Sequence, residues 1–321
     1  MSNRIAVIGA GAWGTALAIQ AARAGNTVTL VARTGHAARH IAETRVNPRL
    51  PSVTLPPAIT VTDSLPADEA ILLWVVPMQH IRETLHRSPP AGRPVVICAK
   101  GVEQQTYRLP LEVLAEWAPN SQGAVLSGPN FAREVAAGLP AAAVIAASDP
   151  ALREAIAGRL ATSTFRLYTN DDPIGTQLGG AAKNVIAIAA GAVTGAGLGE
   201  NARAALVTRG LAELRRLIEA AGGKAETAMG LSGLGDLLLT CTGQSSRNFS
   251  LGHALGAGQS LAATLAASAG VVEGVATAEA LIARAGPIEL PICQAVADVL
   301  AGRQSLTDAM QTLLSRPRRG E

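Results

Sequence analysis

The sequence begins with a short apolar run that leads into three closely spaced glycines. The run "RIAVI" at 4–8 is followed by "GAGAWG", which contains Gly9, Gly11 and Gly14, and then by the helical pattern "TALAIQAARAG". A strand that enters a helix through a glycine-rich turn is the first half of a βαβ unit. This context restricts the N-terminal part of the chain to folds built on a parallel sheet.

The alternation of strands and helices continues as far as Thr169 and then stops. Short β-rich runs are predicted at 4–8, 27–32, 70–76, 94–99, 123–128, 141–147 and 164–169. From Pro173 onward the spacing is helical only, at 173–196, 201–221, 231–241, 247–257, 273–285, 291–302 and 305–314. The sequence therefore predicts an α/β protein, with a Rossmann-type parallel-sheet domain at 1–175 and an all-helical domain at 176–321. The turn "NDDPIG" marks the boundary.

Charge, cysteine content and hydropathy argue against nucleic-acid binding, disulfides, a metal site and membrane insertion. Charged residues form 16% of the chain and the net charge is +3, which does not predict a nucleic-acid surface. The widely spaced Cys98, Cys241 and Cys293 are typical of reduced buried thiols, and they predict neither disulfides nor a metal site. The longest uncharged stretch, 173–199, is interrupted by Lys183, so we expect a buried helix and no membrane insertion. We expect a cytoplasmic protein with no cleaved leader.

The glycine motif has the spacing of a dinucleotide-binding loop. Gly9 would permit the tight turn, Gly11 would leave room for a pyrophosphate, and Gly14 would let the helix pack closely on the strand. The N-terminus of the following helix points free N–H groups at the anion. The alternative is a bare strand-to-helix turn. We favour dinucleotide binding by the 1–175 domain, with the loop residues Gly9, Gly11, Ala12 and Gly14 in contact with the cofactor.

The end of the second predicted strand bears on the choice of cofactor. A site specific for NAD would place Asp or Glu there to hold the ribose 2′-hydroxyl, whereas this chain has Arg33, with His36 close behind. A guanidinium can hold a 2′-phosphate, so NADP(H) is favoured and NAD(H) stays possible. The alternative is a solvated arginine on a loop.

Lysine is scarce, and its positions are informative. Only Lys100, Lys183 and Lys224 occur among 27 Lys and Arg residues, and an amine can release a proton where a guanidinium cannot. Lys183 is the one charge between Asp172 and Glu200, and burial on a helix would lower the pKa of its ammonium toward the range of a general acid or base. The alternative is a lysine that reaches solvent from a helix end.

The other two lysines differ in placement. Lys100 follows a strand at the edge where ligands of open parallel sheets lie, although an ordinary strand-terminal lysine would look the same. Lys224, in "AGGKAE", is interpreted as a surface turn residue.

Three further stretches offer polar side chains for a site. In "SGPNFA", Gly128 would permit close approach of a ligand, and Asn130 would either contact it or cap a helix. In "LSGLGDLLLTC", Asp236 and Thr240 lie one helical turn apart, and the carboxylate needs a partner such as a lysine amine, unless it only caps the helix. In "SSRNFSLG", Arg247 and Asn248 at a helix start suit a phosphate, although a solvated helix terminus is the simpler account.

These motifs together resemble those of the bacterial NAD(P)-dependent glycerol-3-phosphate dehydrogenase family. "GAGAWGTALA", "AKGVE", "SGPNFAREVA", "KNVIAIAAG", "GLSGLGDLLLTC", "SRN" and "VVEGV" occur in the family's order and approximate spacing over nearly the whole chain. The resemblance implies reversible reduction of dihydroxyacetone phosphate to sn-glycerol 3-phosphate, which feeds phospholipid synthesis. We expect the 176–321 domain to be the substrate and catalytic domain, with further contacts from the 1–175 domain.

The resemblance also implies roles for individual residues. Lys183 matches the proton donor and acceptor, and Lys100 matches a second lysine that contacts substrate and cofactor. Catalysis would then involve Lys183, Lys100 and Asp236. Substrate contacts would come from Lys100, Gly128, Asn130, Lys183, Asp236, Ser246, Arg247 and Asn248. Further cofactor contacts would come from Trp13, Arg33, Lys100, Ala132, Arg247, Val271 and Glu273. Many family members have Ser at the position of Asn130.

Two other functions remain open from the sequence. A β-hydroxyacid dehydrogenase shares the Rossmann domain, the helical domain and the catalytic lysine, but acts on carboxylate substrates. A redox sensor would bind the dinucleotide without catalysis. We expect a small-molecule substrate and a homodimer.

Overall fold

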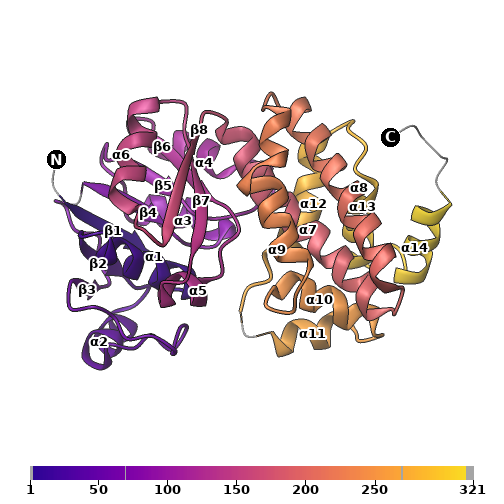
Figure 1. Ribbon diagram of the computed structural model, residues 1–321, viewed down its shortest axis with the longest axis horizontal. Helices are drawn as coiled ribbons and strands as arrows, with labels where there is room; N and C mark the ends of the chain where they lie inside the picture. The colour runs from indigo at the N-terminus through magenta and orange to yellow at the C-terminus, as the bar shows by residue number, and fades with distance from the viewer. Residues whose placement is uncertain (1–2, 69, 269, 316–321) are drawn as a thin grey trace. The chain divides into compact units, whose positions relative to one another are not determined.

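One mixed sheet organises the first half of the chain (Figure 1). In the computed structural model, which describes residues 3–68, 70–268 and 270–315, eight strands pair in the order β3-β2-β1-β4-β5-β6-β7-β8. They are β1 (Arg4–Ile8), β2 (Thr27–Val31), β3 (Ile59–Thr62), β4 (Ile71–Trp74), β5 (Val95–Ile97), β6 (Gly123–Ser127), β7 (Ala141–Ala146) and β8 (Phe165–Asn170). The chain adds strands outward from β1 to β3 and then crosses to β4, so the direction of winding reverses beside β1. Ligands of such sheets lie at that reversal, beyond the carboxyl ends of the strands.

The sheet differs from the prediction in two details. Strand β3 was missed because "ITVT" is a short edge strand whose two threonines are not buried, so it lacks a strong apolar pattern. All strand pairs are parallel except β6 with β7, where Val125 lies opposite Ala146 in antiparallel register. The parallel arrangement expected from strand–helix alternation therefore holds over most of the sheet and fails at that pair.

Helices cover both faces of this sheet, as expected. Ile5 and Val7 of β1 belong to one apolar core, and Ala6 and Ile8 belong to the other, because successive side chains of a strand point to opposite faces. The first core includes residues of α1 (Ala12–Arg23), α2 (Gly35–Thr44), α5 (Ala132–Ala137) and α6 (Pro150–Leu160). The second includes residues of η1 (Met78–His80), α3 (Ile81–Arg87) and α4 (Pro110–Trp117).

The remainder of the described chain is helical. The long helices are α7 (Pro173–Gly195) and α8 (Gly199–Ala220). They are followed by η2 (Ala225–Met229), η3 (Leu231–Gly235), α9 (Asp236–Cys241), α10 (Arg247–Gly256), α11 (Leu261–Ala267), α12 (Glu273–Ala285), α13 (Pro291–Leu300) and α14 (Leu306–Leu314). Helices η2 and α11 were not predicted from the sequence. The sequence pattern predicted a helix only before and after each of them. It also predicted one helix at 231–241, whereas the first five residues are a π-helix, η3, that leads into α9.

The chain divides into two compact units. Met1–Lys100 and Leu109–Gln177 form the sheet unit, and Gly101–Arg108 joins Leu178–Glu321 in the helical unit. Gly101–Arg108 belongs to the helical unit although the sheet unit precedes and follows it in sequence. A single boundary, such as the one predicted after residue 175, therefore does not separate the two units. One bond that ties this segment to the helical unit runs from Arg284 Nη1 to the carbonyl oxygen of Tyr107, at 3.1 Å.

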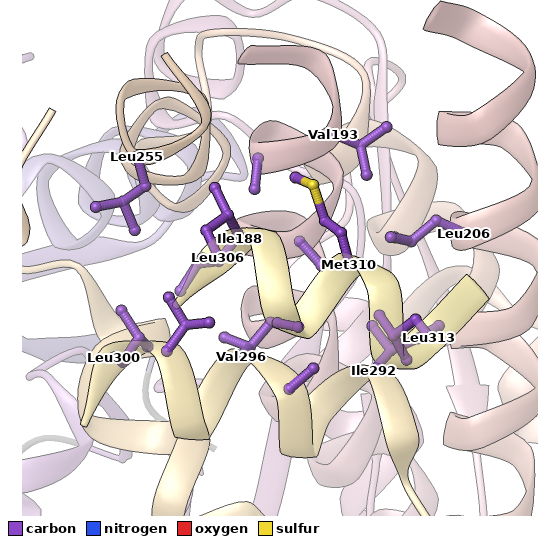
Figure 2. A pocket seen from close by; sticks show the side chains of 15 residues that line it. Ile188, Val193, Leu206, Leu255, Ile292, Val296, Leu300, Leu306, Met310 and Leu313 are labelled. Carbon is purple, nitrogen blue, oxygen red and sulfur yellow. The ribbon is translucent and has the colours of Figure 1, made fainter. Parts of the chain in front are cut away.

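Helix α7 forms the centre of the helical unit. By length and composition alone it could cross a membrane, but 89% of its apolar window is buried inside the protein, as in a core helix. Helices α7, α8, α10, α13 and α14 also surround an apolar pocket (Figure 2), whose lining includes Val193, Leu206, Leu255, Val296 and Met310. None of the predicted site residues lines this pocket.

Candidate functional site

The three glycines of the loop after β1 differ in their surroundings: Gly9 and Gly14 have no room for a side chain, and Gly11 does. Gly9 has φ +111°, and a Cβ on it would lie 2.5 Å from the carbonyl oxygen of Val75. A Cβ on Gly14 would lie 1.8 Å from the carbonyl oxygen of Gly9. Both positions therefore require glycine for the turn and for close packing. At Gly11 a Cβ would meet no atom of the described residues within 4 Å, so its missing side chain leaves open space.

This open space lies at the N-terminus of α1. Gly11 is the N-cap residue and supplies no side-chain cap, so the first N–H groups of the helix face outward beside it. Ala12 and Trp13 form the start of the helix, and both side chains pack against the core of the sheet unit. The open position and the uncapped helix terminus fit a pyrophosphate, and a bare turn would not need the glycine at position 11.

Arg33 and His36 follow β2, at the same edge of the sheet. Both side chains are exposed. Thr34 caps α2 by accepting a hydrogen bond from the N–H of Ala37, at 3.3 Å, and no acidic residue occupies the first turn of the helix. The end of β2 therefore presents a guanidinium beside a helix N-terminus, where a 2′-phosphate would be stabilised.

Lys100 and Gly128 are brought together because β5 and β6 are parallel neighbours and end at the same edge of the sheet. Lys100 Nζ donates to the carbonyl oxygen of Gly128, at 3.0 Å. Gly128 has φ +134°, and a Cβ there would lie 3.0 Å from Cα of Ala143 on β7. This glycine is thus required by the approach of β7, and its carbonyl orients the Lys100 amine.

Asn130 lies beside these residues and does not cap α5. The N-cap residue of α5 is Phe131, and Asn130 Nδ2 instead donates to the carbonyl oxygen of Ala142, at 3.2 Å. Its Oδ1 is buried and has no hydrogen-bond partner among the described residues. Ala132, predicted to contact the cofactor, is the first residue of α5. The capping explanation for Asn130 is therefore wrong, and its amide oxygen is available to a polar ligand atom or to water.

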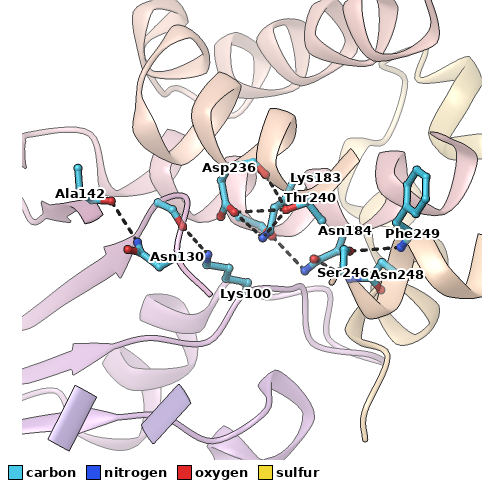
Figure 3. A network of polar contacts seen from close by, with 12 residues as sticks. Lys100, Asn130, Ala142, Lys183, Asn184, Asp236, Thr240, Ser246, Asn248 and Phe249 are labelled. Carbon is cyan, nitrogen blue, oxygen red and sulfur yellow. Dashed lines mark hydrogen bonds and ion pairs between the residues drawn. The ribbon is translucent and has the colours of Figure 1, made fainter. Parts of the chain in front are cut away.

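In the helical unit, Lys183 and Asp236 form a buried ion pair. Lys183 Nζ lies 2.6 Å from Asp236 Oδ1, and the two residues are 8% and 0% exposed. Lys183 Nζ also donates to Thr240 Oγ1, at 3.0 Å, and this hydroxyl donates to the carbonyl oxygen of Asp236, at 2.6 Å. The predicted one-turn spacing of Asp236 and Thr240 thus places both beside one amine (Figure 3).

A glycine one turn before Lys183 allows this pairing. A Cβ on Gly179 would lie 2.5 Å from the carbonyl oxygen of Ser232, so the backbone of η3 lies directly against α7. Gly179 and Lys183 are four residues apart and share one face of α7. The face that receives η3 therefore also carries Lys183 toward the first residue of α9, which is Asp236. Asp236 follows Gly235, the N-cap residue, and pairs with the lysine as expected.

Two effects act on the charge of Lys183. Desolvation disfavours the ammonium form, as the sequence analysis expected, but the Asp236 carboxylate favours it. The neighbouring Cys241 is a neutral thiol, because burial raises its pKa to about 12. The Asp236 carboxylate and the Thr240 hydroxyl oxygen both accept hydrogen bonds from Nζ, so the polar contacts of the amine are made inside the helical unit.

Ser246, Arg247 and Asn248 surround the N-terminus of α10. Ser246 Oγ caps the helix by accepting from the N–H of Phe249, at 3.3 Å. Arg247 Nη1 donates to the carbonyl oxygen of Val271, at 2.7 Å. Two predicted cofactor residues therefore lie near Arg247, namely Val271 itself and Glu273, which begins α12.

Asn248 connects this helix terminus to α7 and α12. Its Nδ2 donates to Asn184 Oδ1 at 2.8 Å, and its Oδ1 accepts from the N–H of Gly274 at 3.0 Å. Asn184, adjacent to Lys183, was not predicted as a site residue. Thr240 was predicted to lie one turn from Asp236, but not to accept a hydrogen bond from Lys183. A polar residue next to the lysine in an alanine-rich helix was the available signal.

Among the described residues, no group of three or more His, Cys, Asp or Glu side chains is placed to hold a metal ion. Cys98, Cys241 and Cys293 are buried and free, and burial raises the pKa of each thiol.

Comparison with known proteins identifies the family. The model of the NAD-dependent glycerol-3-phosphate dehydrogenase N-terminus matches residues 4–153, and that of the C-terminus matches 172–311. A protein named glycerol-3-phosphate dehydrogenase [NAD(P)+] from Acidiphilium cryptum is 55% identical over 318 residues, covering 98% of each chain. One of the same name from Gluconobacter oxydans is 52% identical, covering 98% of this chain and 97% of its own.

A solved structure agrees with the sequence relatives. The crystal structure of glycerol-3-phosphate dehydrogenase from Coxiella burnetii superposes with a TM-score of 0.93 at 38% identity, covering 98% of this chain and 99% of that one. The fold predicted from the sequence, a Rossmann-type domain followed by a helical domain, is confirmed by this match. The chain therefore belongs to the NAD(P)-dependent glycerol-3-phosphate dehydrogenase family of oxidoreductases.

Proposed function

We propose that the protein catalyses the reversible reduction of dihydroxyacetone phosphate to sn-glycerol 3-phosphate with NAD(P)H. The observation that carries this proposal is the buried Lys183–Asp236 pair, with its 2.6 Å separation, inside a chain of this family. A buried charged pair costs solvation energy, so a role beyond stability explains its presence in an otherwise apolar helix.

Lys183 is the proposed proton donor. The cofactor, when bound, supplies a hydride to the carbonyl carbon of the ketone. The Lys183 ammonium then donates its proton to the carbonyl oxygen as negative charge develops there, and it accepts that proton in the reverse direction. Asp236 and Thr240 hold Nζ in one place, because the carboxylate and the hydroxyl oxygen both accept its hydrogen bonds. Lys100, oriented by the Gly128 carbonyl, is assigned to contacts with substrate and cofactor.

The substrate phosphate is assigned to the N-terminus of α10. Arg247 offers a guanidinium, Asn248 is held by two hydrogen bonds, and Ser246 completes the first turn. Charge-assisted hydrogen bonds of this kind fix an anion and orient the rest of the molecule. Gly128 and Asn130 are assigned to the polyol part of the substrate, and the unpartnered Oδ1 of Asn130 supports this role.

The cofactor pyrophosphate is assigned to the glycine loop and the start of α1. The open space at Gly11 and the uncapped helix terminus support this assignment. Arg33 and His36 are assigned to the 2′-phosphate, which favours NADP(H) over NAD(H). The remaining proposed cofactor contacts are Gly9, Ala12, Trp13, Gly14, Lys100, Ala132, Arg247, Val271 and Glu273.

A spectrophotometric assay tests this function. Oxidation of NADPH and of NADH is followed with dihydroxyacetone phosphate, and in parallel with 2-keto and 3-keto acids. We expect turnover with the phosphate-bearing ketone only, and a higher kcat/KM with NADPH than with NADH. Turnover with the keto acids alone would identify a β-hydroxyacid dehydrogenase. Cofactor binding without any ketone-dependent oxidation would identify a sensor.

Three wider assignments accompany this reaction. We infer that its product supplies glycerophospholipid synthesis, that the protein acts in the cytoplasm, and that it works as a homodimer. Light scattering of the purified chain tests the last of these, since a monomer of 32.6 kDa would contradict it.

A further inference from the structure

A buried asparagine that is distant in sequence from the glycine loop is hydrogen-bonded to it. Asn47 is 1% exposed and lies in the segment 46–58 between α2 and β3. Its Nδ2 donates to the carbonyl oxygen of Ala10, at 3.0 Å, and to Thr15 Oγ1, at 2.6 Å. One amide group thus holds the loop and the first turn of α1 together, although neither is near it in sequence.

The segment that carries Asn47 is itself fixed at both ends. Asn47 Oδ1 accepts from the N–H of Arg49, at 2.9 Å. The guanidinium of Arg45 donates to the carbonyl oxygens of Leu55, Pro56 and Ile59. Leu50 and Leu55 are also buried in the core of the sheet unit. Asn47 is therefore positioned by its surroundings before any ligand binds.

The bond to Ala10 determines where the next N–H points. The peptide group between Ala10 and Gly11 is planar, and no cis peptide bond occurs among the described residues, so its C=O and N–H point in opposite directions. A carbonyl held toward Asn47 consequently directs the Gly11 N–H away from Asn47. Gly11 is the N-cap residue of α1 and the position with open space beside it.

We propose that Asn47 is a positioning residue for the cofactor: it fixes the Ala10–Gly11 peptide so that the Gly11 N–H is pre-oriented toward the pyrophosphate. This inference rests on the proposed dinucleotide role of the glycine loop. Without the two N–H donors of Asn47 the peptide can rotate. The conformational entropy lost when it is ordered would then oppose cofactor binding. The effect falls on cofactor affinity and leaves the proton-transfer residues of the helical unit untouched.

Asn26 provides a matched control at the other end of the same helix. It is 4% exposed, and its Nδ2 also makes two bonds, to the carbonyl oxygens of Ala21, at 2.9 Å, and Arg159, at 2.7 Å. It follows the C-terminus of α1, whereas the glycine loop precedes the N-terminus of that helix. Replacing either asparagine removes both hydrogen bonds of its Nδ2, and replacing Asn47 also removes the bond from the Arg49 N–H to its Oδ1. Of the two asparagines, only Asn47 bonds to the loop.

The experiment compares Asn47→Ala and Asn47→Leu with Asn26→Ala and Asn26→Leu. Titration calorimetry measures the Kd of NADPH for each folded variant, and steady-state kinetics measures kcat and both KM values. We expect the Asn47 variants to weaken NADPH binding by at least about tenfold and to raise the KM of NADPH in parallel, while kcat changes by less than about twofold. The Asn26 variants should bind NADPH like the parent protein.

The other outcomes contradict either the positioning role of Asn47 or the proposed function of the protein. Equal Kd values for Asn47 and Asn26 variants would show that Asn47 has no specific effect on the cofactor. Failure of both Asn47 variants to fold, under conditions where the Asn26 variants fold, would make Asn47 a purely structural residue and would also overturn the inference. Absence of NADPH binding by the unsubstituted protein would instead contradict the proposed function.

Discussion

At the scale of single residues, the Lys183 ammonium and the Asp236 carboxylate are buried together and replace each other's missing hydration. Neither group could be buried alone without a large cost, because an unpaired charge in the interior retains none of its interaction with water. Thr240 accepts a further hydrogen bond from Nζ, so the proposed proton donor is fixed in place.

Removing one partner of the pair should therefore cost more than removing both. We expect Asp236→Asn to lower the free energy of unfolding by about 3–5 kcal/mol, because it leaves a buried ammonium without its counter-ion. The double variant Lys183→Met with Asp236→Leu should recover most of that loss, since apolar groups can replace a buried ion pair. Urea unfolding followed by circular dichroism measures both.

A surface pair on α8 serves as the control. Arg215 and Glu219 are mostly exposed, and their side chains lie 3.4 Å apart. Glu219→Gln should change the free energy of unfolding by less than about 1 kcal/mol. If Asp236→Asn were as mild as this control, the pair would not be buried in the way described here.

At the scale of secondary-structure elements, glycines set the distance between α7 and α10. Gly191 and Gly195 on α7 face Gly252 and Gly256 on α10, and the two members of each pair are four positions apart, one helical turn. A Cβ on any of them would lie within 2.2 Å of a backbone oxygen of the other helix. The two helices thus pack backbone to backbone, which places Asn248 against Asn184.

Substitution at this contact should separate packing from helix propensity. Gly191→Ala would place Cβ 2.0 Å from the carbonyl oxygen of Phe249, so we expect a loss of about 1–3 kcal/mol from overpacking. Gly158, inside α6, has no neighbour of the described residues within 4 Å, so Gly158→Ala should stabilise by up to about 1 kcal/mol through helix propensity alone. Thermal unfolding of the two variants measures the contrast, and a stabilising Gly191→Ala would disprove the close packing.

A carboxylate from α8 caps α13 across the helical unit. Glu213 accepts hydrogen bonds from the N–H groups of Ile292, at 2.7 Å, and Cys293, at 3.2 Å. Burial raises the pKa of Glu213 above its ordinary value of 4.5, and the two backbone N–H groups oppose this rise without cancelling it. The folded protein therefore holds this proton more tightly than the unfolded chain does.

The sign of the pH dependence follows from that shift. Stability contributed by protonated Glu213 is fully present below pH 4.5 and is lost as the pH rises through the folded-state pKa. The Tm of the parent protein relative to Glu213→Gln should accordingly fall as the pH is raised from about 4 toward neutrality. Glu219→Gln, on an exposed position of the same helix, controls for net charge. A Tm difference that stayed constant or grew over this range would contradict the raised pKa.

These elements show how far sequence patterns reach. Local patterns predicted the glycine loop, the strands with strong apolar runs and the spacing of Asp236 and Thr240, because such features depend on neighbouring residues. The antiparallel β6–β7 pair and the π-helical turn of η3 depend on contacts between distant segments, such as the approach of Ser232 to Gly179. For the same reason no local pattern marked Asn47, whose partners lie far away in sequence. The one local signal for Asn184 was its polar side chain next to the lysine in an alanine-rich helix, and its bond to Asn248 depends on a distant segment.

At the scale of the whole molecule, the proposed tasks divide between two compact units. The glycine loop and Arg33 belong to the sheet unit, while Lys183, Asp236 and the N-terminus of α10 belong to the helical unit. A substitution confined to the helical core around Lys183 should then affect proton transfer and leave cofactor binding nearly unchanged. Neither task could be assigned to a unit from composition, because both units are rich in the same small apolar residues.

The most direct test of this account measures kcat and the Kd of NADPH in Lys183→Met, with Lys224→Met as the control for loss of a lysine elsewhere in the helical unit. We predict that Lys183→Met lowers kcat by at least about a hundredfold, as expected for loss of a general acid, with the Kd of NADPH changed by less than about twofold. Lys224→Met should match the parent protein in both values. Turnover by Lys183→Met close to that of the parent protein would contradict the account.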